Sequence, residues 1–264
     1  MEPAAAFALP HLSGVRVTGP DARAYLHSQL THDVAAQPLR QWQVSAWCDA
    51  KGRCLLVLLV ALVDEPEAAV ELIAPTEQMP LLLKRLQMYA IGRQVHIGAM
   101  QAVSGGALGW PMTQDPSRHL QLLATHDNAP VADAEQIQAW RQRDLQLPLP
   151  WLSEHSSGAH LPQALALDDH LAVSTTKGCY PGQEVIARLH YLGRNKRQLL
   201  TIDDVAETPQ PATAVLDDNG EPIADWLDAA PPFGLAVSRR LLDGPTSATV
   251  AGCPVTLKPF PAKI

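Results

Sequence analysis

Three extended, apolar segments follow one another between Trp42 and Ala74, and they constrain the fold of this chain more than any other feature. The segment 53–63 is apolar at almost every position, as expected for a strand that is buried on both faces. The residues that precede it, Asp49-Ala50-Lys51-Gly52, suit a hairpin turn, because Asp and Gly tolerate the positive φ values that such turns need. We therefore predict an antiparallel meander with strands over 42–48, 53–63 and 69–74.

A second feature is a turn that combines two glycines, a proline and a cysteine: Lys177-Gly178-Cys179-Tyr180-Pro181-Gly182-Gln183-Glu184. Apolar residues recur at helical spacing over 185–192, and Gly193 stands where such a helix would end. Pro181 suits the first helical position, which places Cys179 at or just outside the N-terminus of the helix. The positive end of a helix and the neighbouring Lys177 both favour a thiolate, so we expect a reactive thiol at Cys179.

Composition and charge exclude several classes of protein. The chain has 264 residues and a formal net charge of −7, which argues against broad electrostatic binding to nucleic acid or to an anionic membrane. The longest apolar run, 54–63, is about half of what spans a bilayer, and the N-terminus lacks the pattern of a signal peptide. Four cysteines without a CxxC pair predict neither zinc nor disulfides, so we expect a cytoplasmic protein without a membrane segment.

The pattern of the chain changes near residue 198. Beyond it, short β segments alternate with turns, which is typical of a small antiparallel barrel or sandwich, and we expect them at 199–202, 213–216, 233–237, 248–250 and 255–257. Before it, the patterns predict further strands at 12–17, 92–103 and 119–125, and Ser104-Gly105-Gly106 are expected to break the second of these. Helices are predicted at about 20–31, 76–89, 132–144 and 163–171. The proline- and serine-containing segment 145–161 is expected to form an irregular loop over a cleft.

The segment from Lys177 to Glu184 closely resembles the signature of the YgfZ family, folate-binding relatives of the glycine-cleavage T-protein. Three other segments are similar to motifs of that family: Gln29-Leu30-Thr31-His32-Asp33-Val34, Cys48-Asp49-Ala50-Lys51-Gly52-Arg53 and Leu161-Pro162-Gln163-Ala164. The resemblance covers roughly residues 12–198 and is most specific at the cysteine motif. The C-terminal part resembles the family only by its pattern.

The resemblance implies an α+β, T-protein-like fold. Residues 1–198 would form a pseudo-symmetric body of two intertwined α+β subdomains around a central hole, closed by a small antiparallel β-barrel over 199–264. Tetrahydrofolate would bind in the central cavity. The implied function is to support the assembly or repair of iron–sulfur enzymes, including enzymes that modify tRNA, with these client proteins or their assembly factors as partners.

In that reading Cys179 is the essential thiol and Lys177 lies beside it. The thiol would ligate a metal or cluster, or trap an electrophile, whereas a small residue packed inside a turn is the structural alternative. One cysteine cannot hold an iron–sulfur cluster alone, so we expect no metal bound by this chain by itself and no conventional enzyme. Cys48 and Cys54 flank the hairpin turn and are interpreted as core residues of the strands.

The sequence also departs from that of an aminomethyltransferase. The strand after the hairpin turn has no carboxylate over 55–60, where those enzymes carry an Asp for the chemistry of the folate nitrogens. A general base needs a titratable group within hydrogen-bond reach, so this stretch argues against aminomethyl transfer. The carboxylate that contacts the folate ring in the family should fall near Ala164, and the adjacent Gln163 is a candidate to contact the pterin instead.

The other candidate folate residues are polar or basic. Arg197 or Lys196 would bind the glutamate tail, and Gln183, Glu184 and Arg188 are further candidates, although Gln183 and Glu184 equally suit capping of the helix. Arg188, Arg194, Lys196 and Arg197 form the only dense basic cluster, for which a solvated face or RNA phosphates are the alternatives. Two other functions therefore stay open: a folate-dependent one-carbon transferase, and a tRNA-modification enzyme that binds RNA.

Overall fold

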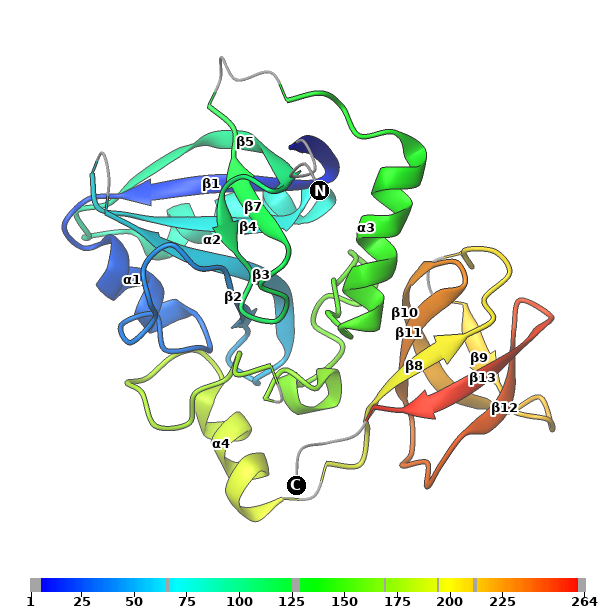
Figure 1. Cartoon of the computed structure of the whole chain (residues 1–264). Helices are drawn as coiled ribbons and strands as arrows, with labels where there is room; N and C mark the ends of the chain where they lie inside the picture. The colour runs from blue at the N-terminus through cyan, green and yellow to red at the C-terminus, as the bar shows by residue number, and fades with distance from the viewer. Residues whose placement is uncertain are drawn as a thin grey trace.

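A seven-stranded antiparallel sheet forms the body of the protein, with the strand order β2-β3-β4-β1-β5-β7-β6 (Figure 1). The structure is a computed structural model and describes residues 6–64, 67–124, 129–168, 170–193, 195–210 and 213–260. The strands of the sheet are β1 (Phe7–Thr18), β2 (Gln43–Cys48), β3 (Cys54–Val63), β4 (Ala69–Pro75), β5 (His96–Gly106), β6 (Trp110–Pro111) and β7 (His119–Leu122).

The predicted meander is confirmed as β2, β3 and β4. Ser45 pairs with Leu58, and Leu59 pairs with Ile73, so the three strands lie antiparallel in sequence order. Alternate residues of β3 face two separate cores, which explains why the strand is apolar throughout. Val57 and Leu59 belong to the core on one face of the sheet, and Leu58 belongs to the core on the other.

Helices α1 (Ala22–Gln29) and α2 (Met79–Tyr89) cover one face of the sheet, and a 3₁₀ turn, η1 (Thr76–Gln78), leads into α2. The two helices bury Tyr25 and Leu86 against β3, and the Tyr25 hydroxyl donates a hydrogen bond of 2.8 Å to the Leu86 carbonyl. The chain thus satisfies a buried hydroxyl within an otherwise apolar layer.

Helix α3 (Ala134–Gln146) lies between the other face of the sheet and the C-terminal barrel (Figure 1). Its N-terminus carries a capping box, in which Asp133 and Gln136 bond each other's backbone N–H groups. Trp140 of this helix packs against β5, where a Cβ on Gly105 would lie 2.7 Å from the indole ring. The prediction that Ser104-Gly105-Gly106 breaks this strand is therefore wrong, because Gly105 lets the helix approach a strand that continues through it.

The barrel is closed, in the order β10-β11-β8-β13-β12-β9, so the barrel alternative of the sequence analysis is confirmed. Its strands are β8 (Leu199–Asp203), β9 (Ala214–Leu216), β10 (Pro222–Ala230), β11 (Phe233–Ser238), β12 (Thr246–Val250) and β13 (Cys253–Pro259). The sequence analysis found five of these strands and missed β10, because its alanines and aspartates are depleted in strands.

Of the short helical stretch predicted over 163–171, the first part is confirmed as a 3₁₀ helix, η2 (Pro162–Leu165). The described residues beyond it do not continue the helix, and Ala166 and Leu171 adopt left-handed backbone conformations with φ of 53° and 56°. The end of the predicted strand 119–125 falls partly outside the described residues. No helix in the described part of the chain is long and apolar enough to cross a membrane.

Candidate functional site

Cys179 lies at the surface in the irregular segment that leads into helix α4 (Gln183–Leu192). The helix begins at Gln183, with Gly182 as its N-cap at φ 81°, so the prediction that Pro181 takes the first helical position is wrong. Cys179 borders a shallow surface pocket, together with Thr175, Gln183 and Glu184. The thiol is thus exposed next to the first turn of the helix.

The hairpin turn between β2 and β3 packs directly against the cysteine motif. A Cβ on Gly182 would lie 2.4 Å from the Gly52 Cα and 2.6 Å from the Asp49 carbonyl oxygen. Two glycines, one from each segment, are therefore required for this contact, and both have positive φ. The motifs around Gly52 and Gly182, which are distant in sequence, form one structural unit.

Thr31 connects a third motif to the same unit. Its hydroxyl donates to the Ala172 carbonyl at 2.6 Å and accepts from the Ala46 N–H at 2.9 Å. Its carbonyl accepts from the Ser174 N–H at 2.8 Å. These bonds attach the segment before Cys179 to strand β2.

Lys177 contacts the end of helix α1. The side chain is buried, and its Nζ donates to the carbonyls of His27 and Leu30, the latter at 2.6 Å. The Nζ also lies 4.9 Å from the centre of the Tyr180 ring, and burial lowers the pKa of Lys177 to about 8. These contacts give Lys177 a structural part, and its proposed part beside the thiol stays a prediction.

The remaining candidates are distributed over different environments. Gln183 donates to the Lys177 carbonyl at 3.1 Å and so braces the motif. Gln163 is buried and donates to the Ile186 carbonyl at 2.9 Å, while its Oε1 has no hydrogen-bond partner. Arg188, Lys196 and Glu184 are exposed, and Arg194 lies outside the described residues.

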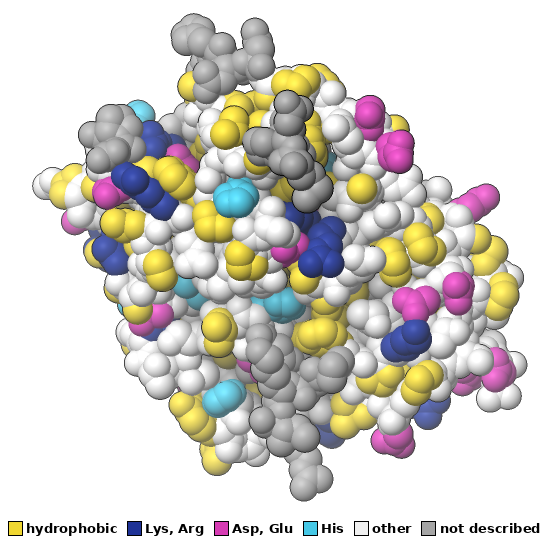
Figure 2. Space-filling model, viewed as in Figure 1, with side chains coloured by type: hydrophobic (Ala, Val, Ile, Leu, Met, Phe, Trp, Pro, Cys, Tyr) yellow, Lys and Arg dark blue, Asp and Glu magenta, His cyan; other side chains and the backbone are white. Residues whose placement is uncertain are grey.

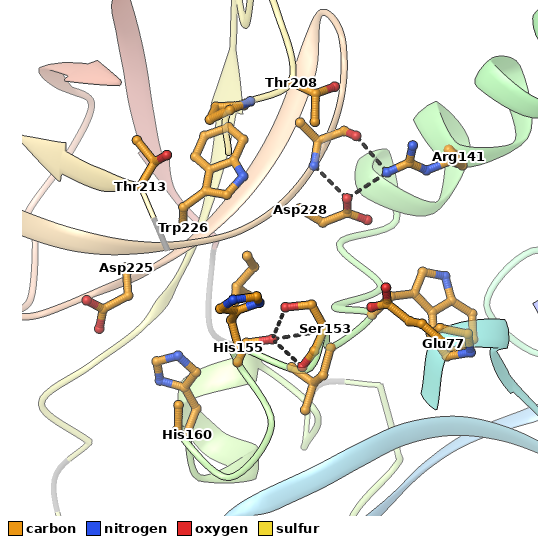
Figure 3. A pocket seen from close by; sticks show the side chains of 18 of the residues that line it. Glu77, Arg141, Ser153, His155, His160, Thr208, Thr213, Asp225, Trp226 and Asp228 are labelled. Atoms are coloured by element: carbon orange, nitrogen blue, oxygen red, sulfur yellow. Dashed lines mark hydrogen bonds and ion pairs between the residues drawn. The ribbon is translucent and has the colours of Figure 1, made fainter. Parts of the chain in front are cut away.

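A second site is a cavity of about 970 Å³, bounded by residues of strand β1 and the end of strand β4, the loop over 151–160 and the barrel. Figure 3 shows barrel residues Asp225 and Trp226 on one side, with His160 and Ser153 of the loop facing them. The loop over 145–161 was predicted to cover a cleft, and its second half lines this cavity. Of the folate candidates, only Arg197 is among the described residues that line it.

Three arginines in the cavity wall are paired with barrel carboxylates. Asp225 accepts from Arg197 at 3.2 Å and from Arg239 at 2.8 Å. Asp228 accepts from Arg141 of helix α3 at 2.7 Å, and burial raises the pKa of Asp228 although Arg141 opposes that shift. Neither carboxylate was predicted as a site residue, because strand β10, which carries both, was not predicted.

Two histidines of the cavity wall have unpartnered nitrogens. Both ring nitrogens of His11, on strand β1, are buried without a hydrogen-bond partner, as is Nδ1 of His160. Burial lowers the pKa of each to about 4, so both imidazoles are neutral at pH 7. No spacing pattern in the sequence marks these two residues.

The thiol and the cavity are separate sites. Among the described residues, none borders both the Cys179 pocket and the large cavity. They are connected through the start of β3, since the Cys54 N–H donates to the His160 carbonyl at 2.8 Å, and the turn before it carries Gly52.

The other thiols belong to the interior or to the barrel. Cys48 and Cys54 are buried with their sulfurs 3.8 Å apart, as expected for core residues of paired strands, and burial raises the pKa of Cys54. Cys253 is exposed at the start of β13. Within the described ranges, no group of three or more His, Cys, Asp or Glu side chains is arranged to hold a metal ion.

The comparison with solved structures defines the class of protein. The crystal structure of glycine cleavage system aminomethyltransferase T from Bartonella henselae matches with a TM-score of 0.68, over 98% of this chain and 85% of that chain, at 14% identity. The chain therefore has the T-protein fold, as predicted.

The comparison with curated proteins then gives the family. The tRNA-modifying protein YgfZ of Edwardsiella ictaluri is 30% identical over 73% of this chain and 69% of its own length. That of Klebsiella pneumoniae is 30% identical over 72% and 68%, and that of Vibrio vulnificus (strain YJ016) is 25% identical over 92% and 87%. No protein-family model matches the chain. The chain belongs to the YgfZ family.

The glycine contact yields a first prediction. Gly182→Ala should lower the free energy of unfolding by about 2–5 kcal/mol, because it combines a left-handed backbone with a clash against the backbone of the turn. Gly220→Ala is the matched control, since Gly220 has φ 80° and nothing within 4 Å of its Cβ position, and should cost only about 1–2 kcal/mol. Urea unfolding of the two variants measures the difference, and equal losses would contradict the contact.

The buried histidines yield a second prediction. Burial lowers the pKa of His11, His32 and His160 to about 4, against 6.5 in an unfolded chain. The unfolded state then binds more protons between pH 6.5 and 4, so the free energy of unfolding should fall as the pH falls through that window, by about 1.4 kcal/mol per pH unit for each proton. In urea unfolding between pH 7 and 4.5, His160→Gln should reduce the slope of the free energy of unfolding against pH by up to about one proton, because the variant lacks this buried imidazole. An unchanged slope would refute the neutral assignment of His160.

Proposed function

We propose that this protein binds a folate in the large cavity and supports iron–sulfur enzymes, including enzymes that modify tRNA, through the thiol of Cys179. Two findings support the proposal: the fold is that of an aminomethyltransferase, and the named relatives are called tRNA-modifying proteins. The partners would be iron–sulfur client proteins or their assembly factors. A reducing compartment such as the cytoplasm suits an activity that depends on a free thiol.

The residues of the cavity fit tetrahydrofolate. Its volume of about 970 Å³ is at the upper end of the range for sites of small ligands, and Trp151 and Trp226 provide flat apolar walls for a ring system. The unpartnered nitrogens of His11 offer hydrogen bonds to a heterocycle. Arg197 and Arg239 give the cavity a cationic edge that suits the carboxylates of a glutamate tail. When bound, the folate would supply a carrier for one-carbon groups.

The observation that carries the proposal is the separation of the thiol from the cavity. A transferase that used Cys179 on a bound folate would need both at one place, because reacting atoms must approach within about 3–3.5 Å. Here the described residues of the two sites do not overlap. The cavity and the thiol therefore suit two tasks, ligand binding and contact with a client, better than one reaction.

The cavity does contain carboxylates, from elements other than the strand over 55–60. Glu77, Asp225 and Asp228 line it, and the last two already pair with arginines. An ion pair with an arginine occupies the carboxylate oxygens that a general base would need free for its substrate. Transfer of a one-carbon unit from formaldehyde to tetrahydrofolate at enzymatic rates would overturn the accessory function and favour the transferase.

Direct modification of tRNA is the second candidate, since the relatives' printed name favours it. The distribution of basic side chains argues against it. Arg197 and Arg239 are paired with Asp225, and basic and acidic side chains are intermingled on the described part of the face in Figure 2. The net charge of −7 opposes binding to a polyanion. Tight tRNA binding that weakens steeply with salt would support this candidate instead.

Replacement of Cys179 separates the two tasks. The activity of iron–sulfur tRNA-modifying enzymes is measured in cells that lack the native protein and carry either the unaltered protein or Cys179→Ala. The variant should restore less than about a tenth of the activity that the unaltered protein restores. Expressed as a free energy, a tenfold loss is about 1.4 kcal/mol. The purified variant should still bind tetrahydrofolate within about twofold, because Cys179 does not line the cavity. Cys253→Ala removes the other exposed thiol and should behave like the unaltered protein. Full restoration by Cys179→Ala would refute the part given to this thiol.

A further inference from the structure

We propose that the imidazoles of His11 and His160 recognise, by hydrogen bonds, an uncharged heterocyclic part of the molecule that the large cavity binds. The inference rests on the proposed function and deepens it, because it assigns the residues that recognise the ring of the ligand.

The first reason is that these imidazoles have buried nitrogens without partners. Both nitrogens of His11 and Nδ1 of His160 are buried and make no hydrogen bond to the protein. His160 is only 4% exposed, and its backbone is fixed by the bond that its carbonyl accepts from the Cys54 N–H. Buried polar atoms in folded proteins are almost always paired, and both residues line the cavity, so a ligand there is a candidate partner for these nitrogens.

The second reason is their charge state. Burial lowers the pKa of both groups to about 4, and nearby cations add to that shift: Arg141 at His11, and Arg197 with Arg53 at His160. Asp144 and Asp225, respectively, oppose it without reversing it. A neutral imidazole offers one donor and one acceptor, which matches the alternating N–H and carbonyl or ring-nitrogen groups of a heterocycle rather than a free ion.

The third reason is the distribution of charge around the cavity. The cationic groups at its edge are already shared, since Arg197 and Arg239 both pair with Asp225. His11 lies instead on strand β1, and Leu12 and Trp151 also line the cavity with apolar surface. A flat heterocycle with hydrogen-bonding edges suits such a site, because its faces are apolar and its edges polar.

The test compares two ligands in two pairs of variants. Dissociation constants are measured by calorimetry for tetrahydrofolate and for 6-methyltetrahydropterin, which has the ring but no glutamate tail. His11→Leu and His160→Leu should each weaken both ligands by about tenfold, as expected for one lost hydrogen bond to a buried partner. His11→Gln and His160→Gln keep a donor and an acceptor and should recover affinity to within about threefold of the unaltered protein.

His119→Gln is the matched control. His119 also has a buried, unpartnered Nδ1, but it is not among the described residues that line the cavity. Its replacement should leave both dissociation constants within about twofold. A change as large as that of the cavity variants would show a general loss of stability and would overturn the assignment.

The outcomes distinguish this inference from the proposed function. If the unaltered protein does not bind tetrahydrofolate, the proposed function fails. If it binds and the Leu variants bind equally well, or weaken only the ligand with the tail, the inference fails and the proposed function stands. Should a Leu variant not fold, nitrogen NMR of histidine-labelled unaltered protein replaces it. Ring-nitrogen signals of His11 and His160 should shift when the pterin binds, and unchanged signals would overturn the inference.

Discussion

The close approach of Gly52 and Gly182 is the contact on which the arrangement around Cys179 depends. Because neither residue has a side chain, the β2–β3 turn can lie against the backbone before helix α4. Thr31 then bonds the segment before Cys179 to strand β2, and Lys177 bonds it to the end of helix α1. Segments that are far apart in sequence therefore meet in one place, and together they hold the segment that carries the exposed thiol of Cys179.

The second site depends on a different kind of interaction. Paired charges close the wall of the cavity: Arg141 of helix α3 bonds Asp228 of the barrel, and Arg197 bonds Asp225. Among the described residues that line the cavity, the nitrogens of His11 and Nδ1 of His160 are buried without hydrogen-bond partners. Neutral imidazoles and paired charges therefore both line the cavity, and the pair of Arg141 with Asp228 also joins helix α3 to the barrel.

Much of the fold could be predicted from the sequence, since it is encoded in local patterns. The meander around β3 and most barrel strands follow from periodicity and turn residues, and the motif around Cys179 singled out a thiol that the structure shows to be exposed. Strand β10 was missed because Asp225 and Asp228 look unsuited to a strand until their arginine partners are known. The cavity histidines could not be found either, because only the tertiary structure places His11 and His160 on the wall of one cavity.

The central claim is that the proposed folate site and the thiol of Cys179 are separate. Its most direct test is the rate at which iodoacetamide alkylates Cys179, followed by mass spectrometry, with and without saturating tetrahydrofolate. Saturation is monitored by the intrinsic tryptophan fluorescence, to which Trp151 and Trp226 in the cavity wall contribute. The account predicts a fluorescence change on binding and an alkylation rate that stays within about twofold, because no described residue borders both sites. Complete protection of Cys179 by bound folate would contradict it.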